Sequence, residues 1–273
     1  MARMDRLRVG PTVSKLRSQL RNWYVVGPAA YLVMLSPLRH ALERSALARS
    51  VLTLRFRDGR TLRLQINDMQ VYVEIFILDD YDIPDARWED ARVVVDAGAN
   101  VGAATLWFAT RCPQARILAI EPGAHTREVL RQNLAANGLN DRVEVIAAAL
   151  GGEPGTAYLQ TGGPSVLNHL TADTSDGEPV EMTTVDAIVR DHNLDSIDFF
   201  KLDCEGSEFE ILLGDTDGWL PRVRTMVGEW HPSTSHTPEE IAGKLRDSGF
   251  DVEMEPHPTL AGFGNFTARR RAP

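Results

Sequence analysis

The fold is decided by residues 93–105, which read VVVDAGANVGAAT. A run of β-branched residues ends at Asp96, two glycines follow at positions four apart, and a helix-like segment begins. This pattern predicts a buried strand, a tight glycine turn and the N-terminus of a helix. Because glycine has no Cβ, a ligand can come close to the backbone of such a turn. We therefore predict a ligand-binding loop between Gly98 and Gly102.

The spacing within this loop separates two classes of cofactor-binding protein. Dinucleotide-binding loops read G-x-G-x-x-G, and their second glycine lets a pyrophosphate sit on the helix N-terminus. Here Asn100 stands where that second glycine should be. The pattern Asp-x-Gly-x-Asn-x-Gly instead resembles the cofactor loop of methyltransferases that use S-adenosylmethionine, a cofactor without phosphate. A turn that merely closes the strand onto the helix is the alternative.

A second strand is predicted at residues 116–120 and ends at Glu121. An acidic side chain at this place can accept hydrogen bonds from both hydroxyls of a ribose. Since both cofactor classes contain adenosine, Glu121 does not discriminate between them, and a solvated carboxylate is the alternative. A third strand is predicted at residues 143–150. The small Ala148 and Ala149 would leave room for an adenine ring, or they pack tightly like ordinary core residues.

The longest motif lies at residues 197–214, which read IDFFKLDCEGSEFEILLG. Together with the glycine loop it resembles the FkbM family of methyltransferases, whose signature is roughly Asp-hydrophobic-hydrophobic-Lys-hydrophobic-Asp-x-Glu-Gly-x-Glu. Residues 182–188 resemble the Thr-hydrophobic-Asp segment of this family. Residues 227–231 resemble the Glu-x-His that ends its fifth strand. The resemblance covers about residues 70–231, and each element of the long signature is present.

The resemblance implies an α/β fold, the Rossmann-like class I methyltransferase fold, with a seven-stranded, mostly parallel sheet and one antiparallel strand. Hydrophobic spacing alone supports two late strands, 250–254 and 263–269, after a helix that begins at Thr237. Residues 51–56 and 61–66 alternate around Asp58-Gly59, which predicts a β-hairpin.

We expect two parts in this chain. Residues 1–90 form an N-terminal helical segment, the hairpin and a cap on the acceptor side. Residues 91–273 form the S-adenosylmethionine-binding methyltransferase domain. The stretch from 153 to 179, rich in Gly, Thr, Ser and Asp, reads as a long irregular loop, and loops of that length are usually functional or disordered. We expect it to cover the acceptor together with residues 68–90.

The composition of the chain disfavours some classes of binding partner. The net charge of −9 disfavours a nucleic-acid substrate, because phosphate contacts need a basic face. The apolar stretch at 24–38 contains two prolines and is shorter than the roughly 20 residues of a membrane span. The basic first fifty residues would either touch a membrane surface or form a solvated helix face. Cys112 and Cys204 give no disulfide framework, and we expect a cytoplasmic protein.

Methyl transfer from a sulfonium is an in-line displacement, and alignment can supply about 7–11 kcal/mol of the acceleration. A hydroxyl acceptor also needs a general base within hydrogen-bond reach. We favour His231 as this base, because its ordinary pKa lies near 6.5. Asp203 would orient His231 or bind the acceptor, and Glu205 would join them or contact the following helix N-terminus.

The catalytic prediction is therefore His231, Asp203 and Glu205. The residues predicted to bind S-adenosylmethionine are Asp96, Gly98, Asn100, Gly102, Glu121, Pro122, Ala148, Ala149 and Asp203. The ligand types at Asp203, Glu205 and His231 would suit a divalent metal, but three residues are a weak basis and we assign no metal.

The function predicted from the sequence is S-adenosylmethionine-dependent O-methylation of a hydroxyl on a small molecule, sugar or natural product. The substrate range follows from the resemblance, since FkbM family members act on sugars, polyketides and other hydroxyls. A nucleotide-dependent oxidoreductase is the alternative from another enzyme class. A non-catalytic cofactor-binding scaffold is the third hypothesis. The absence of G-x-G-x-x-G argues against the oxidoreductase, and the set of polar residues at strand ends argues against the scaffold.

Overall fold

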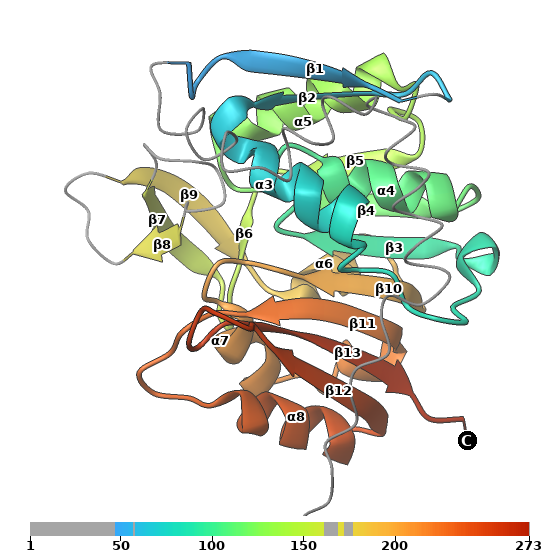
Figure 1. The fold of residues 1–273 in the computed structure, drawn as a ribbon. Helices are drawn as coiled ribbons and strands as arrows, with labels where there is room; N and C mark the ends of the chain where they lie inside the picture. The colour runs from blue at the N-terminus through green and yellow to red at the C-terminus, as the bar shows by residue number, and fades with distance from the viewer. Residues whose placement is uncertain (1–46, 57, 161–168, 172–176, 273) are drawn as a thin grey trace, which may run out of the picture.

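The computed structural model describes residues 47–56, 58–160, 169–171 and 177–272 (Figure 1). The helix expected at the N-terminus lies outside the described residues up to position 46. At the centre is a seven-stranded sheet with the order β12-β13-β11-β10-β3-β4-β5. Its strands are β3 (Val93–Ala97), β4 (Arg116–Ile120), β5 (Val143–Ile146), β10 (Ile197–Leu202), β11 (Val223–Trp230), β12 (Phe250–Pro256) and β13 (Gly264–Arg270).

Neighbouring strands of this sheet are parallel except where β13 pairs antiparallel with β11 and β12. The predicted mostly parallel sheet with one antiparallel strand is therefore confirmed. The late strands lie within a residue or two of their expected bounds. The helix before them, α8 (Pro238–Asp247), begins as predicted with Thr237 as its cap, in a capping box with Glu240.

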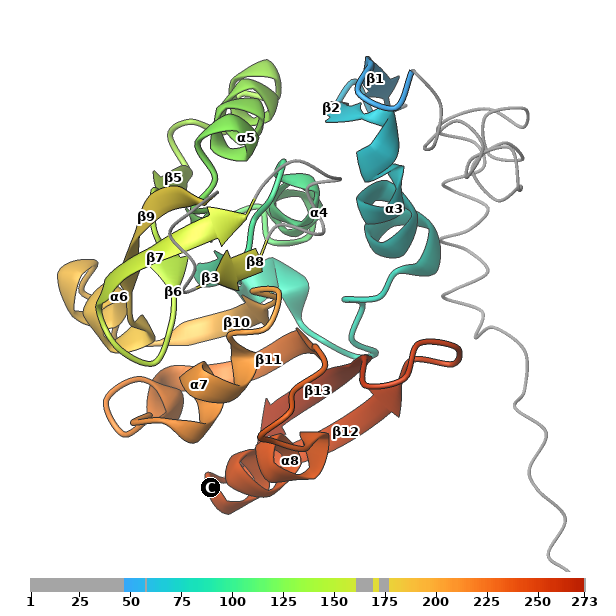
Figure 2. The same ribbon diagram turned by 90° about the vertical axis from the view of Figure 1, so that its left-hand side faces the viewer.

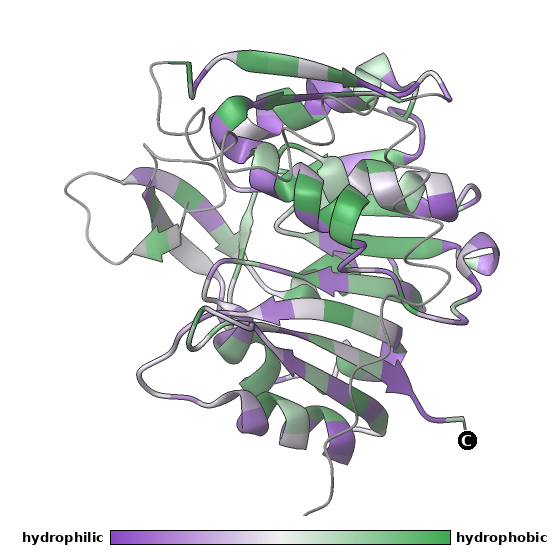
Figure 3. Cartoon of the chain, viewed as in Figure 1, coloured by the Kyte–Doolittle hydropathy of each residue, from purple (hydrophilic) through white to green (hydrophobic). Residues whose placement is uncertain are grey.

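Helices cover both faces of the sheet (Figure 2). Side chains alternate between the faces along a strand, so Val94 and Phe199 enter one buried cluster and Val95 and Phe200 the other. Strands buried on both faces read as continuous apolar runs, and Figure 3 shows this hydropathy on β3. The first cluster receives α4 (Ala103–Arg111) and α5 (Ala124–Ala136), and the second receives α6 (Val185–Asp191), α7 (Glu208–Leu213) and α8.

The predicted hairpin is confirmed as β1 (Val51–Arg55) paired with β2 (Thr61–Gln65). The amide side chains of Asn133 in α5 and of Asn137, the residue that caps the end of α5, attach it to the core. Asn133 bonds the backbone N–H and C=O of Arg63, and Asn137 does the same for Thr61. These amides give the outer edge of β2 the hydrogen bonds that a neighbouring strand would give.

A helical segment follows the hairpin and reaches the end of the sheet. It consists of η1 (Ile66–Asp68), α3 (Met69–Tyr72) and η2 (Val73–Leu78), and η3 (Trp88–Asp90) precedes β3. Its apolar side, with Tyr72, Phe76 and Ile77, belongs to the same buried cluster as Val94. The six residues of η2 form a π-helical turn, a feature often found at functional sites. The boundary expected at residue 90 stays a prediction.

Two expectations about residues 143–183 are wrong. The third strand does not continue to 150, because the chain leaves the main sheet after Ile146. The residues expected as an irregular loop contain strands. A second sheet of order β6-β9-β7-β8 is built from β6 (Ala149–Leu150), β7 (Gly155–Gln160), β8 (His169–Thr171) and β9 (Glu178–Thr183).

The physical reason is the small core of this second sheet. Its buried cluster consists of Ala149, Leu159 and Val180, so few apolar positions mark its strands in the sequence. No helix within the described ranges combines the length and apolarity that a bilayer span requires.

Candidate active site

A cavity of about 610 Å³ lies where the carboxyl ends of β3, β4, β10 and β11 meet. Ligands of open α/β sheets bind at this edge. Most of the predicted site residues line the cavity: Gly98, Asn100, Glu121, Pro122, Ala148, Ala149, Asp203, Glu205 and His231. Asp96 and Gly102 do not belong to its lining. The topology thus brings one glycine loop and one polar cluster from distant parts of the chain to a common volume.

The glycine loop is shaped by backbone conformation. Gly98 and Gly102 have φ of 73° and 89°, and Asn100 has φ of 51°. A Cβ on Gly98 would lie 1.7 Å from the backbone oxygen of Asp203. Gly98 therefore has no side chain because the backbone at the end of β10 lies against it. The sequence pattern had suggested a different reason, the close approach of a ligand.

Asp96 and Gly102 serve the loop from outside the cavity. Asp96 is fully buried; its Oδ2 accepts a hydrogen bond of 2.6 Å from Thr105, and its Oδ1 lies 3.3 Å from the Lys201 ammonium. A Cβ on Gly102 would meet the side chain of Leu130 at 2.5 Å. Asp96 and Gly102 therefore support the loop from outside the cavity. Direct contact of either residue with a cofactor stays a prediction.

Lys201 is a site residue that the sequence analysis missed. Its ammonium donates to the backbone oxygens of Gly98 at 2.7 Å and Ala97 at 3.2 Å, and it lies 3.4 Å from Asp203 Oδ2. The side chain is only 2% exposed. Burial alone would lower the pKa of Lys201, but Asp203 and Asp96 outweigh burial and raise it. A lysine inside an apolar strand was the available signal.

Glu121 lies at the end of β4 and is 7% exposed. Its carboxylate accepts the backbone N–H groups of Asn100 at 2.9 Å and Gly123 at 2.8 Å. Burial raises the pKa of Glu121 to about 7, although these two hydrogen bonds oppose the shift. Glu121 braces the glycine loop and also faces the cavity, so its contact with a ribose stays a prediction.

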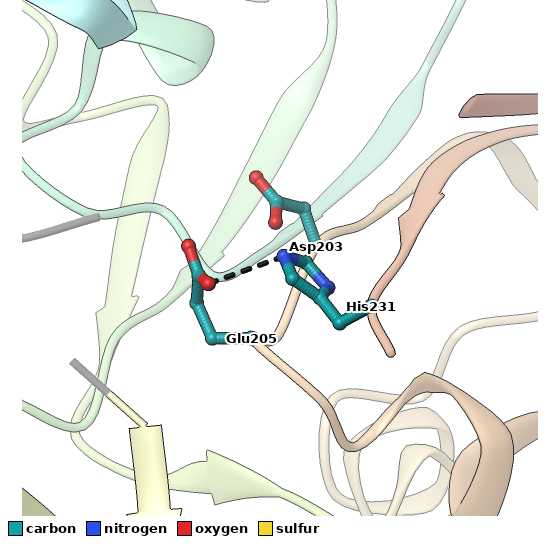
Figure 4. Close-up of side chains that lie close together, drawn as sticks. All are labelled: Asp203, Glu205 and His231. Atoms are coloured by element: carbon teal, nitrogen blue, oxygen red, sulfur yellow. Dashed lines mark ion pairs between the residues drawn. The ribbon is translucent and has the colours of Figure 1, made fainter. Parts of the chain in front are cut away.

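Asp203, Glu205 and His231 come together as the sequence predicted (Figure 4). One ligand-type atom from each lies within 4.8 Å of the others. His231 Nε2 is 3.1 Å from Glu205 Oε2. Glu205 has a left-handed backbone, with φ of 52°, which is a strained conformation for a residue other than glycine. Strain of this kind clusters at functional sites.

Glu208, which the sequence analysis did not assign to the site, holds the other side of the ring. Its Oε1 is 3.2 Å from His231 Nδ1, and it accepts the backbone N–H of Cys204 at 2.7 Å. Burial alone would lower the pKa of His231, but Glu205 and Glu208 raise it to about 11. The imidazole is therefore protonated on both ring nitrogens at neutral pH and is a poor base. The ring is oriented by Glu205 and Glu208, a role we had considered for Asp203.

An acidic wall continues from this cluster. The Tyr81 hydroxyl lies 3.2 Å from both Asp203 Oδ2 and Glu229 Oε1, and burial raises the pKa of Glu229 well above its ordinary value. On η2, Glu74 faces the same cavity and is hydrogen-bonded by the Gln70 side chain. Burial raises the pKa of Glu74 to about 7, with a further contribution from nearby carboxylates. Gln70, Val71, Glu74, Ile75 and Tyr81 of residues 68–90 line the cavity, and their role in covering an acceptor stays a prediction.

Two further walls are mainly apolar. The loop between β12 and β13 contributes Leu260 and Phe263, and the Phe263 ring meets His231 edge-on, with centroids 5.5 Å apart. The sequence analysis missed this loop because nothing local marks it. On the other side, Leu159 and Leu170 of the second sheet join Ala149.

Comparisons with known proteins find a family model, sequence relatives and structural neighbours of this chain. A family model described as the methyltransferase FkbM domain matches residues 96–252. The chain is 32% identical over 235 residues to methyltransferase sdnD of Sordaria araneosa, covering 74% of this chain and 89% of that protein. It is 28% identical over 254 residues to the 31-O-demethyl-FK506 methyltransferase FkbM of Streptomyces tacrolimicus, covering 81% and 97%. A solved precorrin-6y C5,15-methyltransferase from Geobacter metallireducens GS-15 aligns with a TM-score of 0.42 and 17% identity, covering 68% and 84%.

Proposed function

Because the chain belongs to the FkbM family of methyltransferases, we propose that it moves the methyl group of S-adenosylmethionine to a hydroxyl oxygen of a small molecule, sugar or natural product. The observation that carries the proposal is the single cavity shared by the glycine loop and the Asp203–Glu205–His231 cluster. A relative's name adds support, since the Streptomyces tacrolimicus protein is named for a 31-O-demethyl substrate.

In this proposal the cofactor lies against the glycine loop. Glu121 accepts the ribose hydroxyls, and the small Ala148 and Ala149, with Leu159 beside them, leave room for the adenine. The sulfonium carries a positive charge, which the carboxylates of the acidic wall favour. A dinucleotide fits less well, because the loop lacks the glycine at position 100 that a pyrophosphate needs.

The acceptor hydroxyl is held at the Asp203–Glu205–His231 cluster and must lose its proton. His231 already carries a proton, so a carboxylate of the acidic wall is the better acceptor. We assign this role to Glu74, since it lines the cavity and its pKa of about 7 is near the pH at which a general base works best. The O–H bond breaks toward Glu74, the oxygen attacks the methyl carbon, and the S–CH₃ bond breaks to leave a neutral thioether.

A transfer assay tests the proposal. Purified chain is incubated with S-adenosylmethionine labelled in its methyl group and with separate panels of hydroxylated and amine-bearing natural products. Label in an ether linkage supports O-methylation, and label only on nitrogen or carbon contradicts it. Calorimetry with S-adenosylmethionine and with NAD distinguishes the methyltransferase from the oxidoreductase hypothesis.

A further inference from the structure

We propose that Asp203, Glu205 and His231 bind a divalent metal cation that coordinates the oxygen of the acceptor hydroxyl. The role of the ion rests on the proposed function, but its binding does not. Each residue offers one ligand atom, and these atoms lie within 4.8 Å of one another. In an octahedral site with bonds of about 2.1 Å, neighbouring ligands are about 3 Å apart and opposite ligands about 4.2 Å. The 3.1 Å between His231 Nε2 and Glu205 Oε2 matches a neighbouring pair.

One carboxylate oxygen of this cluster has no hydrogen-bond partner among the described residues. Asp203 Oδ1 is buried and accepts no hydrogen bond from any residue that the structure describes. The other oxygen of this carboxylate is satisfied by the Tyr81 hydroxyl and lies beside Lys201. A buried polar atom left unpaired costs about 1–3 kcal/mol, so each such atom in a folded protein calls for an explanation. A cation beside Asp203 Oδ1 supplies the missing partner.

The orientation of His231 is the third observation. Glu208 is 0% exposed, and it holds Nδ1 while its carboxylate is itself fixed by the N–H groups of Cys204 and Gly206. Nε2 faces the Glu205 carboxylate (Figure 4), and its proton must leave to solvent when Nε2 binds the ion. Metal-binding histidines almost always donate a hydrogen bond from their other ring nitrogen to a carboxylate or carbonyl oxygen, which fixes the orientation of the ring. Glu208 fits this supporting role.

The charge and ligand types indicate the kind of ion. The cavity lining carries the carboxylates of Glu74, Asp203, Glu205 and Glu229, whereas its cationic groups near them are Lys201 and His231. Carboxylate oxygens attract an added cation. One imidazole and two carboxylates suit a first-row divalent ion such as Mn²⁺, rather than a soft ion that prefers thiolates.

The ion would act on the proton transfer. A hydroxyl bound to a divalent cation loses its proton more readily, because the cation stabilises the alkoxide. Glu74 would receive the proton, as in the proposed function. The metal is neither oxidised nor reduced, so the reaction needs no further reactant.

Mn²⁺ binding to the full chain, freed of metals by a chelator, tests the proposal without cofactor or acceptor. The spectrum of free Mn²⁺ in electron paramagnetic resonance should disappear as one ion binds per chain. Glu205→Gln and His231→Ala should each weaken binding at least tenfold. Glu210→Gln and His236→Ala are matched controls, because both residues are exposed and lie near the cluster in sequence, and they should bind as the wild type does.

Circular dichroism and thermal unfolding identify a variant that fails to fold, and Glu205→Gln is the milder of the two changes. Absence of Mn²⁺ binding by the wild type overturns the proposal, as does equal binding by the folded Glu205→Gln and the wild type. Binding without any methyl transfer keeps the metal site and contradicts the proposed function. Methyl transfer that is unchanged by chelator, with no Mn²⁺ bound, overturns the metal site and keeps the function.

Discussion

The two sides of the cavity each hold a carboxyl group whose pKa is raised to about 7 by desolvation, yet the groups have different partners. On the cofactor side, Glu121 accepts the backbone N–H of Asn100 in the glycine loop and that of Gly123, two residues after Glu121. On the acceptor side, Glu74 is hydrogen-bonded by the side chain of Gln70, four residues earlier in the same helical segment. Glu121 and Glu74 thus have similar pKa values but are held in different ways. Backbone N–H groups hold Glu121, whereas a side chain, that of Gln70, holds Glu74.

The same contrast holds for the regions around them. The cofactor side is built from backbone, with φ angles and close approaches that only certain residues allow. The acceptor side is built from side chains that come from η2, β10, β11 and the β12–β13 loop. We expect changes on the cofactor side to affect binding and stability together, and changes on the acceptor side to affect turnover alone.

The largest effect is expected for Gly98→Ala. The new Cβ would lie 1.7 Å from the Asp203 oxygen at a φ of 73°, so the loop must move away from β10. The left-handed strain and the overpacking together cost roughly 2–5 kcal/mol of stability. Calorimetry should detect no S-adenosylmethionine binding, and thermal unfolding should shift to lower temperature.

Gly138→Ala is the matched control for this change. Gly138 has a similar φ of 64°, but nothing lies within 4 Å of its Cβ position. This variant should lose only about 1–2 kcal/mol of stability and bind the cofactor normally. Normal cofactor binding by Gly98→Ala would show that the close approach to β10 does not shape the cofactor site.

The next largest effect is expected on the acceptor side. Glu74→Gln should lower turnover about 10²–10⁴-fold, the usual range for a general base, with little change in cofactor affinity. Glu74 must be ionised to accept a proton, so wild-type turnover should rise with pH through about 7, and the variant should lose this rise. Turnover measured from pH 5.5 to 9 with the acceptor found in the transfer assay checks both statements.

Glu89→Gln is the control, because Glu89 is exposed and, like Glu74, lies in the part of the chain before β3. It should leave turnover and its pH dependence unchanged. A Glu74→Gln variant that keeps both the turnover and the rise with pH would assign the proton to another carboxylate of the acidic wall.

A smaller effect on cofactor binding is expected for Glu121→Gln. The amide keeps the shape of the side chain but loses the charge and one acceptor oxygen. Hydrogen bonds to charged groups are worth about 1.5–3 kcal/mol, which corresponds to roughly ten- to a hundredfold in affinity for S-adenosylmethionine. Calorimetry at pH 8 measures the affinity for S-adenosylmethionine. The control is Glu74→Gln, which changes the acceptor side and should bind the cofactor as the wild type does. Unchanged affinity in Glu121→Gln would limit Glu121 to bracing the loop.

Sequence alone was a good guide to the cofactor side for a physical reason. A strand, a glycine turn and a helix start leave local traces, so the loop at 98–102 and the strand ends at Asp96 and Glu121 were found. The seven-stranded sheet followed from the family resemblance together with these local patterns.

The acceptor side was harder to predict because its partners are distant in the chain. His231 was predicted as the general base, and its ring contacts Glu208, which lies 23 residues away in the sequence and was not expected there. Glu74 and Phe263 reach the cavity through tertiary packing, which leaves no periodic signal. The second sheet was missed because its core consists of Ala149, Leu159 and Val180.

The smallest effect separates the ionisation of Glu121 from its hydrogen bonds. Below about pH 4.5 this carboxyl is protonated in both the folded and the unfolded chain. Between about 4.5 and 7 the unfolded chain has lost the proton while the folded protein keeps it, so stability falls as pH rises through this window. The full shift corresponds to at most about 3 kcal/mol. Glu121→Gln lacks this loss, and its missing acceptor oxygen adds an offset that does not change with pH. The unfolding temperature of the variant minus that of the wild type should therefore increase by several degrees from pH 4.5 to 7.5. Other buried carboxyls such as Glu74 cancel in this difference, so a flat difference would mean that Glu121 is ionised throughout the window.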